Sequence, residues 1–384
     1  MATGVDTKAE GVSSRLRNLR IGAHLWNADA AQKYLGRSVD QAMITMSWAK
    51  DGEDFSNLSE FRSAASSLGD GAAIYVDVGF NRQNDDSMKS LGSDPIVLQW
   101  ADAIGESGRT VYVAVAPEMN GFNGWRRMEH KADHISDPRT FTDAFARVAQ
   151  AFADRGVTNV KWVFAPTSDG QKISDFYPFD VNIDVIDLRG GRGDNYSSYG
   201  QHHMEDDRTF DAQFSNAYGV AKVLALRSGA PEKIWITDIC QRDCANAMHA
   251  AADSLGNYGA VETINFPSMG TFDYKARRAL RSLFSGISTE PDRAVNVRAR
   301  LVDQNGLAIQ GWGVWPEGSA IGMDTNGAGI FYLNDVEPGD QRYSVRNINS
   351  GGAFQKITLT IPSADRADPE VTPWIDIGDV IVRK

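Results

Sequence analysis

One segment of the sequence combines the side chains that carbohydrate chemistry uses. An apolar run from Thr110 to Val115 is long enough for one buried strand, and it breaks at Pro117. The Gly-punctuated loop that follows carries Glu118, Asn120 and Trp125. A carboxyl group exchanges protons, an amide bonds hydroxyl groups, and an indole stacks on a sugar ring. The pattern indicates a sugar-handling site, with a helix cap at Glu118 and a core Trp125 as the structural alternative.

The element that positions this loop belongs to a longer alternation of apolar runs and amphipathic segments. The runs are Leu19–Leu25, Ala42–Trp48, Ala72–Val78, Thr110–Val115, Val160–Phe164, Ile183–Leu188, Lys233–Thr237 and Val261–Phe266. Eight strands that alternate with helices over roughly 250 residues predict a (β/α)8 TIM barrel. A doubly wound open sheet is the alternative, but no strand is followed by the Gly-x-Gly-x-x-Gly of dinucleotide-binding proteins.

Caps and helical periodicity predict the connecting helices. Asp137 and Pro138 open one helix as its cap and its first-turn proline, and Gly156 closes it. Further helices are predicted over Ser215–Arg227 and Asp243–Leu255.

In a parallel barrel, reacting groups gather at the carboxyl ends of the strands. Besides the loop after the fourth strand, the polar and aromatic side chains there are His24, Trp26, Trp48, Asp77, Asp169, Asp187, Asn195, Tyr196, Asp238, Glu262 and Asn265. Aromatic and acidic groups dominate and basic groups are few. This lining predicts a neutral polyhydroxylated ligand, because a phosphorylated one would require more Lys and Arg.

The pattern changes after Phe284. A polar linker, Ser288–Arg293, leads into about ninety residues of alternating runs with Asn-Gly turns at Asn305 and Asn326, which predict a small all-β sandwich. The expected domains are an extension (1–18), the barrel (19–287), the linker (288–293) and the sandwich (294–384).

The order of the sandwich motifs resembles the carboxypeptidase-regulatory-like, transthyretin-like fold over Val295–Val382. The matching motifs are Leu-Val-Asp-Gln-Asn-Gly, Asp-Thr-Asn-Gly-Ala-Gly-Ile-Phe and Val-Glu-Pro-Gly. Such modules are accessory, so the resemblance says little about activity. We expect that an assembly partner, where one exists, would attach through this sandwich.

Charge and composition restrict the partners. The net charge of −11, without a basic patch, makes nucleic acid an unsuitable partner. There is no apolar run of about 18 residues, so we expect no membrane insertion, and the first ten residues have no apolar signal-peptide region. The adjacent His202 and His203 lie in a polar segment typical of an exposed loop, so no metal is expected. We expect an extracellular or virion-associated protein.

Five segments resemble motifs of the family 26 glycoside hydrolases, the β-mannanases and β-1,3-xylanases, over about Leu19–Gly286. The segments are Leu35-Gly-Arg-Ser with Met46-Ser-Trp48, Ala116-Pro-Glu-Met-Asn-Gly-Phe-Asn-Gly-Trp125, Asn159-Val-Lys-Trp-Val-Phe-Ala-Pro166, Phe176-Tyr-Pro-Phe-Asp180 before Val185-Ile-Asp187, and Ile234-Trp-Ile-Thr-Asp238. The resemblance implies a barrel whose acid/base ends the fourth strand and whose nucleophile ends the seventh.

Carried over residue by residue, the resemblance makes Glu118 the general acid/base and places Asp238 at the nucleophile position. It implies that Tyr196 is the active-site tyrosine after the sixth strand. The sequence departs from the family at two positions: Pro117 replaces a His, and Asp238 replaces a Glu that is longer by one methylene. A retaining pair, a water-activating pair and a pair without hydrolysis all stay open.

Together these features predict a glycoside hydrolase that cleaves internal β-glycosidic bonds of a β-mannan-like, β-xylan-like or bacterial exopolysaccharide. Two carboxylates suffice for this chemistry, so no cofactor is expected. The substrate-binding residues are expected to be Asn120, Trp125, Tyr196, Trp26, Trp48, His24 and Asp187. The alternative is a non-catalytic carbohydrate-binding or structural protein, for example a phage tail or cell-surface component.

Overall fold

The chain forms two compact units, one built on a barrel and one on a pair of sheets. The structure is a computed structural model, which describes residues 18–24, 37–48, 58–69, 71–80, 88–120, 135, 137–168, 172–190, 210–237, 251, 254–266, 295–316, 323–336, 338–347, 355–363 and 374–382. The expected linker, 288–293, lies outside the described residues, so the domain boundaries stay predictions.

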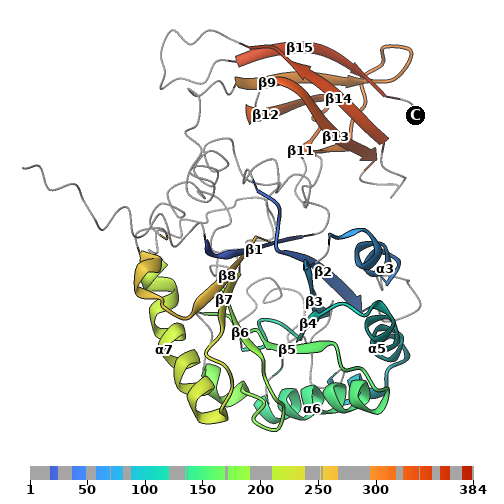
Figure 1. The fold of residues 1–384 in the computed structure, drawn as a ribbon. Coiled ribbons are helices and arrows are strands. Elements are labelled where there is room, and N and C mark those ends of the chain that lie inside the picture. Colours follow the sequence, from blue (N-terminus) through green and yellow to red (C-terminus); the bar gives the residue numbers. More distant parts are fainter. Residues whose placement is uncertain are drawn as a thin grey trace, which may run out of the picture. The chain divides into compact units, whose positions relative to one another are not determined.

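Eight parallel strands close into a barrel in chain order (Figure 1). They are β1 (Arg20–His24), β2 (Gln41–Trp48), β3 (Ala73–Phe80), β4 (Val111–Val115), β5 (Val160–Phe164), β6 (Val185–Arg189), β7 (Ile234–Thr237) and β8 (Val261–Phe266). Each coincides with one of the eight predicted runs, which confirms the predicted (β/α)8 barrel. Because all strands run the same way, their carboxyl ends lie at one end of the barrel.

The helices of the described part of the barrel unit are α3 (Leu58–Ser67), α5 (Pro95–Ser107), α6 (Pro138–Asp154) and α7 (Phe210–Ser228), which lie around the strands (Figure 1). The predicted cap of α6 is confirmed, because the Asp137 carboxylate accepts a hydrogen bond from Arg139 N–H at 3.0 Å. Helix α7 begins five residues before the predicted Ser215. The predicted helix over Asp243–Leu255 falls almost entirely outside the described residues. Short 3-10 turns, η2 (Leu91–Ser93), η4 (Ile173–Phe176) and η5 (Leu255–Asn257), complete this unit.

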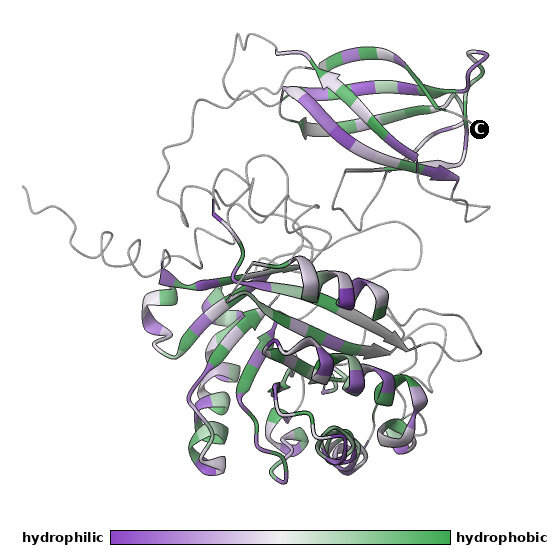
Figure 2. Cartoon of the chain, turned by 45° about the vertical axis from the view of Figure 1, so that its right-hand side comes forward, coloured by the Kyte–Doolittle hydropathy of each residue, from purple (hydrophilic) through white to green (hydrophobic). Residues whose placement is uncertain are grey.

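The outer layer of the barrel core is aromatic. Phe145 and Phe152 of α6 pack their rings on Trp162 of β5 at centroid distances of 5.6 and 5.2 Å. Figure 2 shows the apolar colour concentrated on the strands, while the helices carry polar residues on part of their surface. The aromatic residues of α6, which repeat at helical spacing, thus pack against the strands.

Side chains inside the barrel follow the two-residue period of the strands. Tyr75 of β3 and Trp235 of β7 come from strands that are not neighbours, yet their rings meet at 5.4 Å. Tyr112 of β4 contacts the same indole at 4.6 Å. These rings fill the barrel interior. Polar side chains that also point inward, from later positions of the strands, therefore lie beyond the rings, toward the carboxyl ends.

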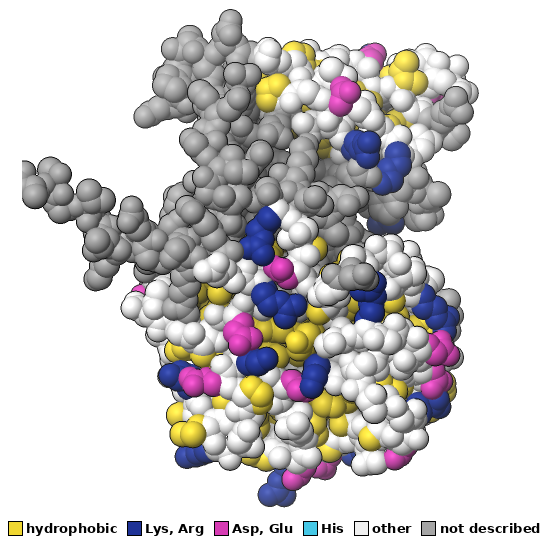
Figure 3. All heavy atoms as spheres, in the orientation of Figure 1, with side chains coloured by type: hydrophobic (Ala, Val, Ile, Leu, Met, Phe, Trp, Pro, Cys, Tyr) yellow, Lys and Arg dark blue, Asp and Glu magenta, His cyan; other side chains and the backbone are white. Residues whose placement is uncertain are grey.

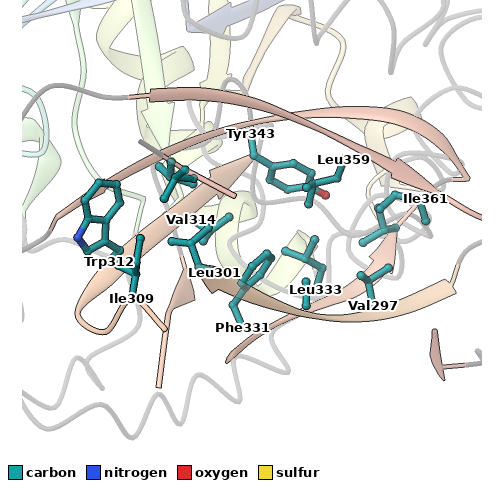
Figure 4. Close-up of a cluster of buried hydrophobic side chains, with 14 of the residues drawn as sticks. Val297, Leu301, Ile309, Trp312, Val314, Phe331, Leu333, Tyr343, Leu359 and Ile361 are labelled. Carbon is teal, nitrogen blue, oxygen red and sulfur yellow. The ribbon is translucent and has the colours of Figure 1, made fainter. Parts of the chain in front are cut away.

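The second unit consists of two sheets around one apolar core (Figure 4). Its strands are β9 (Val295–Val302), β10 (Trp312–Pro316), β11 (Met323–Asp324), β12 (Ile330–Val336), β13 (Gly339–Asn347), β14 (Gln355–Ile361) and β15 (Trp374–Ile381). The sheet orders are β11-β10-β13-β14 and β12-β9-β15. The predicted sandwich is confirmed, and Trp312 of β10 packs in its apolar core.

Strand β15 does not stand out in the sequence. Its apolar residues are interrupted by Asp376, Gly378 and Asp379, and the strand bulges between Asp376 and Gly378. It pairs parallel with β9, where Arg298 and Arg300 face Asp376 and Asp379 as exposed ion pairs. Long-range pairing of this kind leaves little local signal in a sequence.

On the face of the barrel unit that Figure 3 shows, acidic and basic side chains are interspersed among the described residues. Among the described helices, none has the length and apolar character that a membrane span requires.

The barrel interior yields a prediction about packing. At Gly22 of β1, an added Cβ would lie 2.0 Å from the Asn265 side-chain oxygen. Gly22→Ala should therefore lower the free energy of unfolding by about 1–3 kcal/mol, measured by urea denaturation. The matched change is Gly219→Ala in α7, where nothing lies within 4 Å; it should raise stability by about 0.5–1 kcal/mol. Equal stability of the two variants would contradict this packing.

Candidate functional site

The structure describes only part of the predicted site. Glu118, Asn120 and Asp187 are described with their side chains. His24 and Trp48 are the last residues of β1 and β2, at the predicted end of the barrel, but their side chains are outside the described part. The remaining predicted residues, Trp26, Trp125, Tyr196 and Asp238, lie outside the described residues, and Asp238 follows the last residue of β7 in sequence.

Glu118 lies just beyond β4 in an unusual backbone conformation. Ala116 and Glu118 have φ values of 47° and 63°, the left-handed region that non-glycine residues rarely adopt. The Ala116 N–H donates to the Val78 carbonyl at 3.0 Å, and the Glu118 N–H donates to the Ala165 carbonyl at 2.8 Å. These bonds attach the segment to β3 and to the end of β5. Backbone strain held in place by its surroundings is typical of functional sites.

Asn120 uses its side chain on the protein itself. Its Oδ1 accepts from Thr167 N–H at 2.9 Å, and its Nδ2 donates to the Thr167 carbonyl at 3.2 Å. The residue is 5% exposed. Its role in substrate binding stays a prediction, and the described contacts join the Glu118 loop to the end of β5.

Asp187 is fully buried within a cluster of polar side chains. Its Oδ2 accepts from the Tyr75 hydroxyl at 2.7 Å and lies 3.2 Å from Arg189 Nη2. Arg189 donates to both carboxylate oxygens of Asp77, at 2.8 and 2.6 Å, and to the Tyr75 oxygen at 2.7 Å. The guanidinium therefore joins β3 to β6 across the barrel interior. Substrate contact by Asp187 stays a prediction.

A second chain of donors reaches Asp187 from the opposite side. Gln41 Nε2 donates to Asn265 Oδ1 at 3.2 Å, and Asn265 Nδ2 donates to Thr237 Oγ1 at 3.0 Å. The Thr237 hydroxyl then donates to Asp187 Oδ1 at 2.6 Å. Both carboxylate oxygens of Asp187 are thereby occupied, and β2, β8, β7 and β6 are joined by one directed network.

Burial and the neighbouring charges shift the pKa values of the groups in this cluster. Burial raises the pKa of Asp187, although Arg189 and the Thr237 and Tyr75 hydroxyls act in the opposite direction. Burial also raises the pKa of the Tyr75 hydroxyl well above its ordinary value. For Arg189, burial alone would lower the pKa, but Asp77, Tyr75 and Asp187 outweigh it and raise the pKa. The guanidinium therefore stays charged and pairs with two carboxylates.

Backbone bonds connect the same strand ends along the rim. The Arg189 N–H donates to the Pro166 carbonyl at 2.9 Å, and its carbonyl accepts from Ser168 N–H at 2.8 Å. The Gly190 N–H donates to the Thr237 carbonyl at 2.7 Å. The ends of β5, β6 and β7 are thus fixed to one another, and the bonds of Glu118 and Asn120 attach the loop after β4 to this rim.

The sequence interpretation missed Arg189 and Tyr75, which carry most of this network. A signal was present in both strands. Tyr75 and Asp77, like Asp187 and Arg189, are two residues apart and therefore lie on one face of a strand. Two such polar pairs within otherwise apolar runs indicate a buried polar layer, because a lone buried charge is too costly to keep.

Within the described part of the chain, no group of three or more His, Cys, Asp or Glu residues is arranged to hold a metal ion. The His202 and His203 pair lies outside that part.

Comparison with known proteins adds a distant likeness to glycoside hydrolases. No protein family model matches the chain. Endoglucanase H of Acetivibrio thermocellus is 22% identical over 217 residues, an alignment that covers 54% of this chain and 23% of that protein. The chain thus aligns with less than a quarter of the length of this curated relative.

Solved structures of mannanases resemble the chain at low identity. A modular endo-β-1,4-mannanase of glycoside hydrolase family 26 from Cellulomonas fimi is 11% identical, with 93% of this chain and 98% of that chain covered and a TM-score of 0.48. A family 26 β-mannanase from Bacteroides ovatus is 11% identical, with coverages of 72% and 91% and a TM-score of 0.47. The fold itself rests on the strand order of this chain.

The buried cluster predicts a large loss of stability when its cation is removed. Arg189→Met leaves two carboxylates buried without their partner and should lower the free energy of unfolding by about 3–5 kcal/mol. Arg155→Met, which breaks an exposed pair with Asp102, is the control and should cost about 0–1 kcal/mol. Urea denaturation followed by circular dichroism measures both. A loss for Arg189→Met no larger than that of the control would contradict the paired arrangement.

Proposed function

We propose that the protein is a glycoside hydrolase that cleaves internal β-glycosidic bonds of a polysaccharide. Glu118 is its general acid/base, and Asp238 is its second carboxylate. The observation that carries the proposal is the position of Glu118: a half-buried carboxyl at the carboxyl end of β4, on a strained backbone held by β3 and β5. The alignment with an endoglucanase supports the same chemistry.

In this mechanism a protonated Glu118 donates its proton to the glycosidic oxygen as the bond from that oxygen to the anomeric carbon breaks. The leaving sugar departs with the proton, and positive charge develops at the anomeric carbon. Asp238 stabilises that charge. In the second half of the reaction, or in the same step, water supplies the new oxygen and its proton passes to a carboxylate.

The second carboxylate determines the stereochemical course. A retaining pair is separated by about 5–5.5 Å and forms a covalent glycosyl ester, whereas an inverting pair about 6.5–9.5 Å apart admits a water molecule. Thr237, which precedes Asp238 in sequence, is fixed by Asp187, Asn265 and Gly190. This anchoring fixes the last described residue before Asp238, and it is compatible with either of the two courses.

The charge at this end of the barrel supports a neutral substrate. The described side chains include the carboxylates of Glu118, Asp77 and Asp187, and Arg189 is already bonded to two of them. An anionic sugar would meet net negative charge and no available cation among these groups. β-Mannans, β-xylans, β-glucans and neutral bacterial exopolysaccharides are the candidate substrates. Such polymers lie outside cells, which fits an extracellular or virion-associated protein.

Oligosaccharide release from these polymers tests the assignment. Glu118→Gln and Asp238→Asn should each lower the rate by roughly 10²–10⁴-fold, because each removes a group that carries a proton or stabilises charge in the transition state. Glu106→Gln, on the exposed side of α5, is the matched control and should keep the wild-type rate. Chromatography measures the products, and NMR of the anomer formed first distinguishes retention from inversion.

Full activity in either carboxylate variant would overturn its assigned role. Binding to a polymer without release of oligosaccharides, over the whole panel, would instead favour a non-catalytic carbohydrate-binding or phage-tail protein.

A further inference from the structure

We propose that Asn120 is a positioning residue, which fixes the acid/base Glu118 through the backbone of Thr167 rather than by touching the sugar. This inference rests on the proposed function and assigns to Asn120 a role other than the substrate contact that its sequence position suggests.

The first argument is the geometry of the amide. The side chain of Asn120 meets the N–H and the carbonyl of one residue, Thr167, in a two-bond pair like that between neighbouring strands. Only 5% of the residue is exposed. Half of its hydrogen-bonding capacity is thus used within the protein, and little surface is left for a sugar hydroxyl.

The second argument is the strained backbone around Glu118, in the segment that leads to Asn120. Glu118 is held at a φ of 63°, and Ala116 at 47°. Each such residue costs on the order of 1–3 kcal/mol and persists only where surrounding contacts determine it. On one side, the Glu118 N–H bonds to Ala165. On the other side, Met119 is buried at 4% exposure and the amide of Asn120 is attached to Thr167. Glu118 therefore lies between two fixed points.

The third argument is that Thr167 is itself fixed. It forms a parallel bridge with Arg189, and the neighbouring Pro166 and Ser168 exchange backbone hydrogen bonds with the same residue. Arg189 is anchored by Asp77 and Tyr75. Asn120 thus connects the Glu118 loop to a part of the barrel end that is held by several hydrogen bonds. Without the amide, the strained loop can relax and move the carboxyl from its position.

The activity test compares Asn120→Ala with a matched variant at the other end of the barrel. Asn159 also uses its amide on backbone groups, the carbonyls of Ile104 and Arg109, both at 2.7 Å. Asn120→Ala should lower kcat by about tenfold to a hundredfold with KM nearly unchanged, the effect of a displaced catalytic group. Asn159→Ala should keep kcat. A raised KM with an unchanged kcat for Asn120→Ala would show a sugar contact and overturn the inference.

A double-variant cycle identifies the group through which Asn120 acts. In a Glu118→Ala background, Asn120→Ala should cause no further loss of kcat, because the carboxyl that it positions is already absent. A further tenfold loss would mean that Asn120 acts independently of Glu118, which contradicts the proposal. Full activity of the single variant Glu118→Ala would instead overturn the proposed function.

Hydrogen exchange tests the same contact without any substrate. In Asn120→Ala, the amides of Ala116, Glu118, Met119, Asn120, Thr167 and Ser168 should exchange faster than in the wild type, whereas Asn159→Ala should leave them protected. Unchanged protection in Asn120→Ala would overturn the inference even if a substrate were never found. Faster exchange spread evenly over all barrel strands would also overturn it, because it would show a loss of global stability rather than release of the loop.

Discussion

The charge of Arg189 is the constraint on which the carboxyl end of the barrel depends. Its guanidinium lies where water is excluded, so it must keep its bonds to Asp77 and its close approach to Asp187. Those two acids belong to β3 and β6, which are not neighbours in the barrel. One cation therefore fixes the distance between β3 and β6 across the barrel interior. The other strands must close the barrel around that distance.

The rim built on this cluster is the described part of the predicted site. The strand ends and the segment from Ala116 to Asn120 are fixed by backbone and amide bonds to their neighbours. The predicted sugar-binding residues Trp125 and Tyr196 lie outside the described residues. In barrels of this class a fixed framework of strands carries the site while the connecting loops vary, so one framework can serve different chemistries.

The sequence predicts the elements well and the contacts poorly, for a physical reason. Hydrophobic periodicity is a local property, so all eight barrel strands and the α6 cap at Asp137 could be recognised. The partner of a buried polar group is chosen by long-range geometry. The sequence therefore could not show that the oxygens of Asp187 are bonded to Tyr75 and Thr237. It could not show either that the Asn120 amide bonds Thr167. Whether these two residues also contact a sugar stays a prediction.

The sandwich has a topological feature with a mechanical consequence. Its first and last described strands, β9 and β15, pair in parallel from Asn296 beside Trp374 to Val302 beside Ile381, with one bulge between Asp376 and Gly378. The chain enters at one end of this pair and leaves at the other, about 26 Å away for eight residues of strand. Tension along the chain would load these hydrogen bonds in shear and all together, whereas an antiparallel pair would open one bond at a time. Separation of the two ends of the sandwich would therefore require several of these hydrogen bonds to break together.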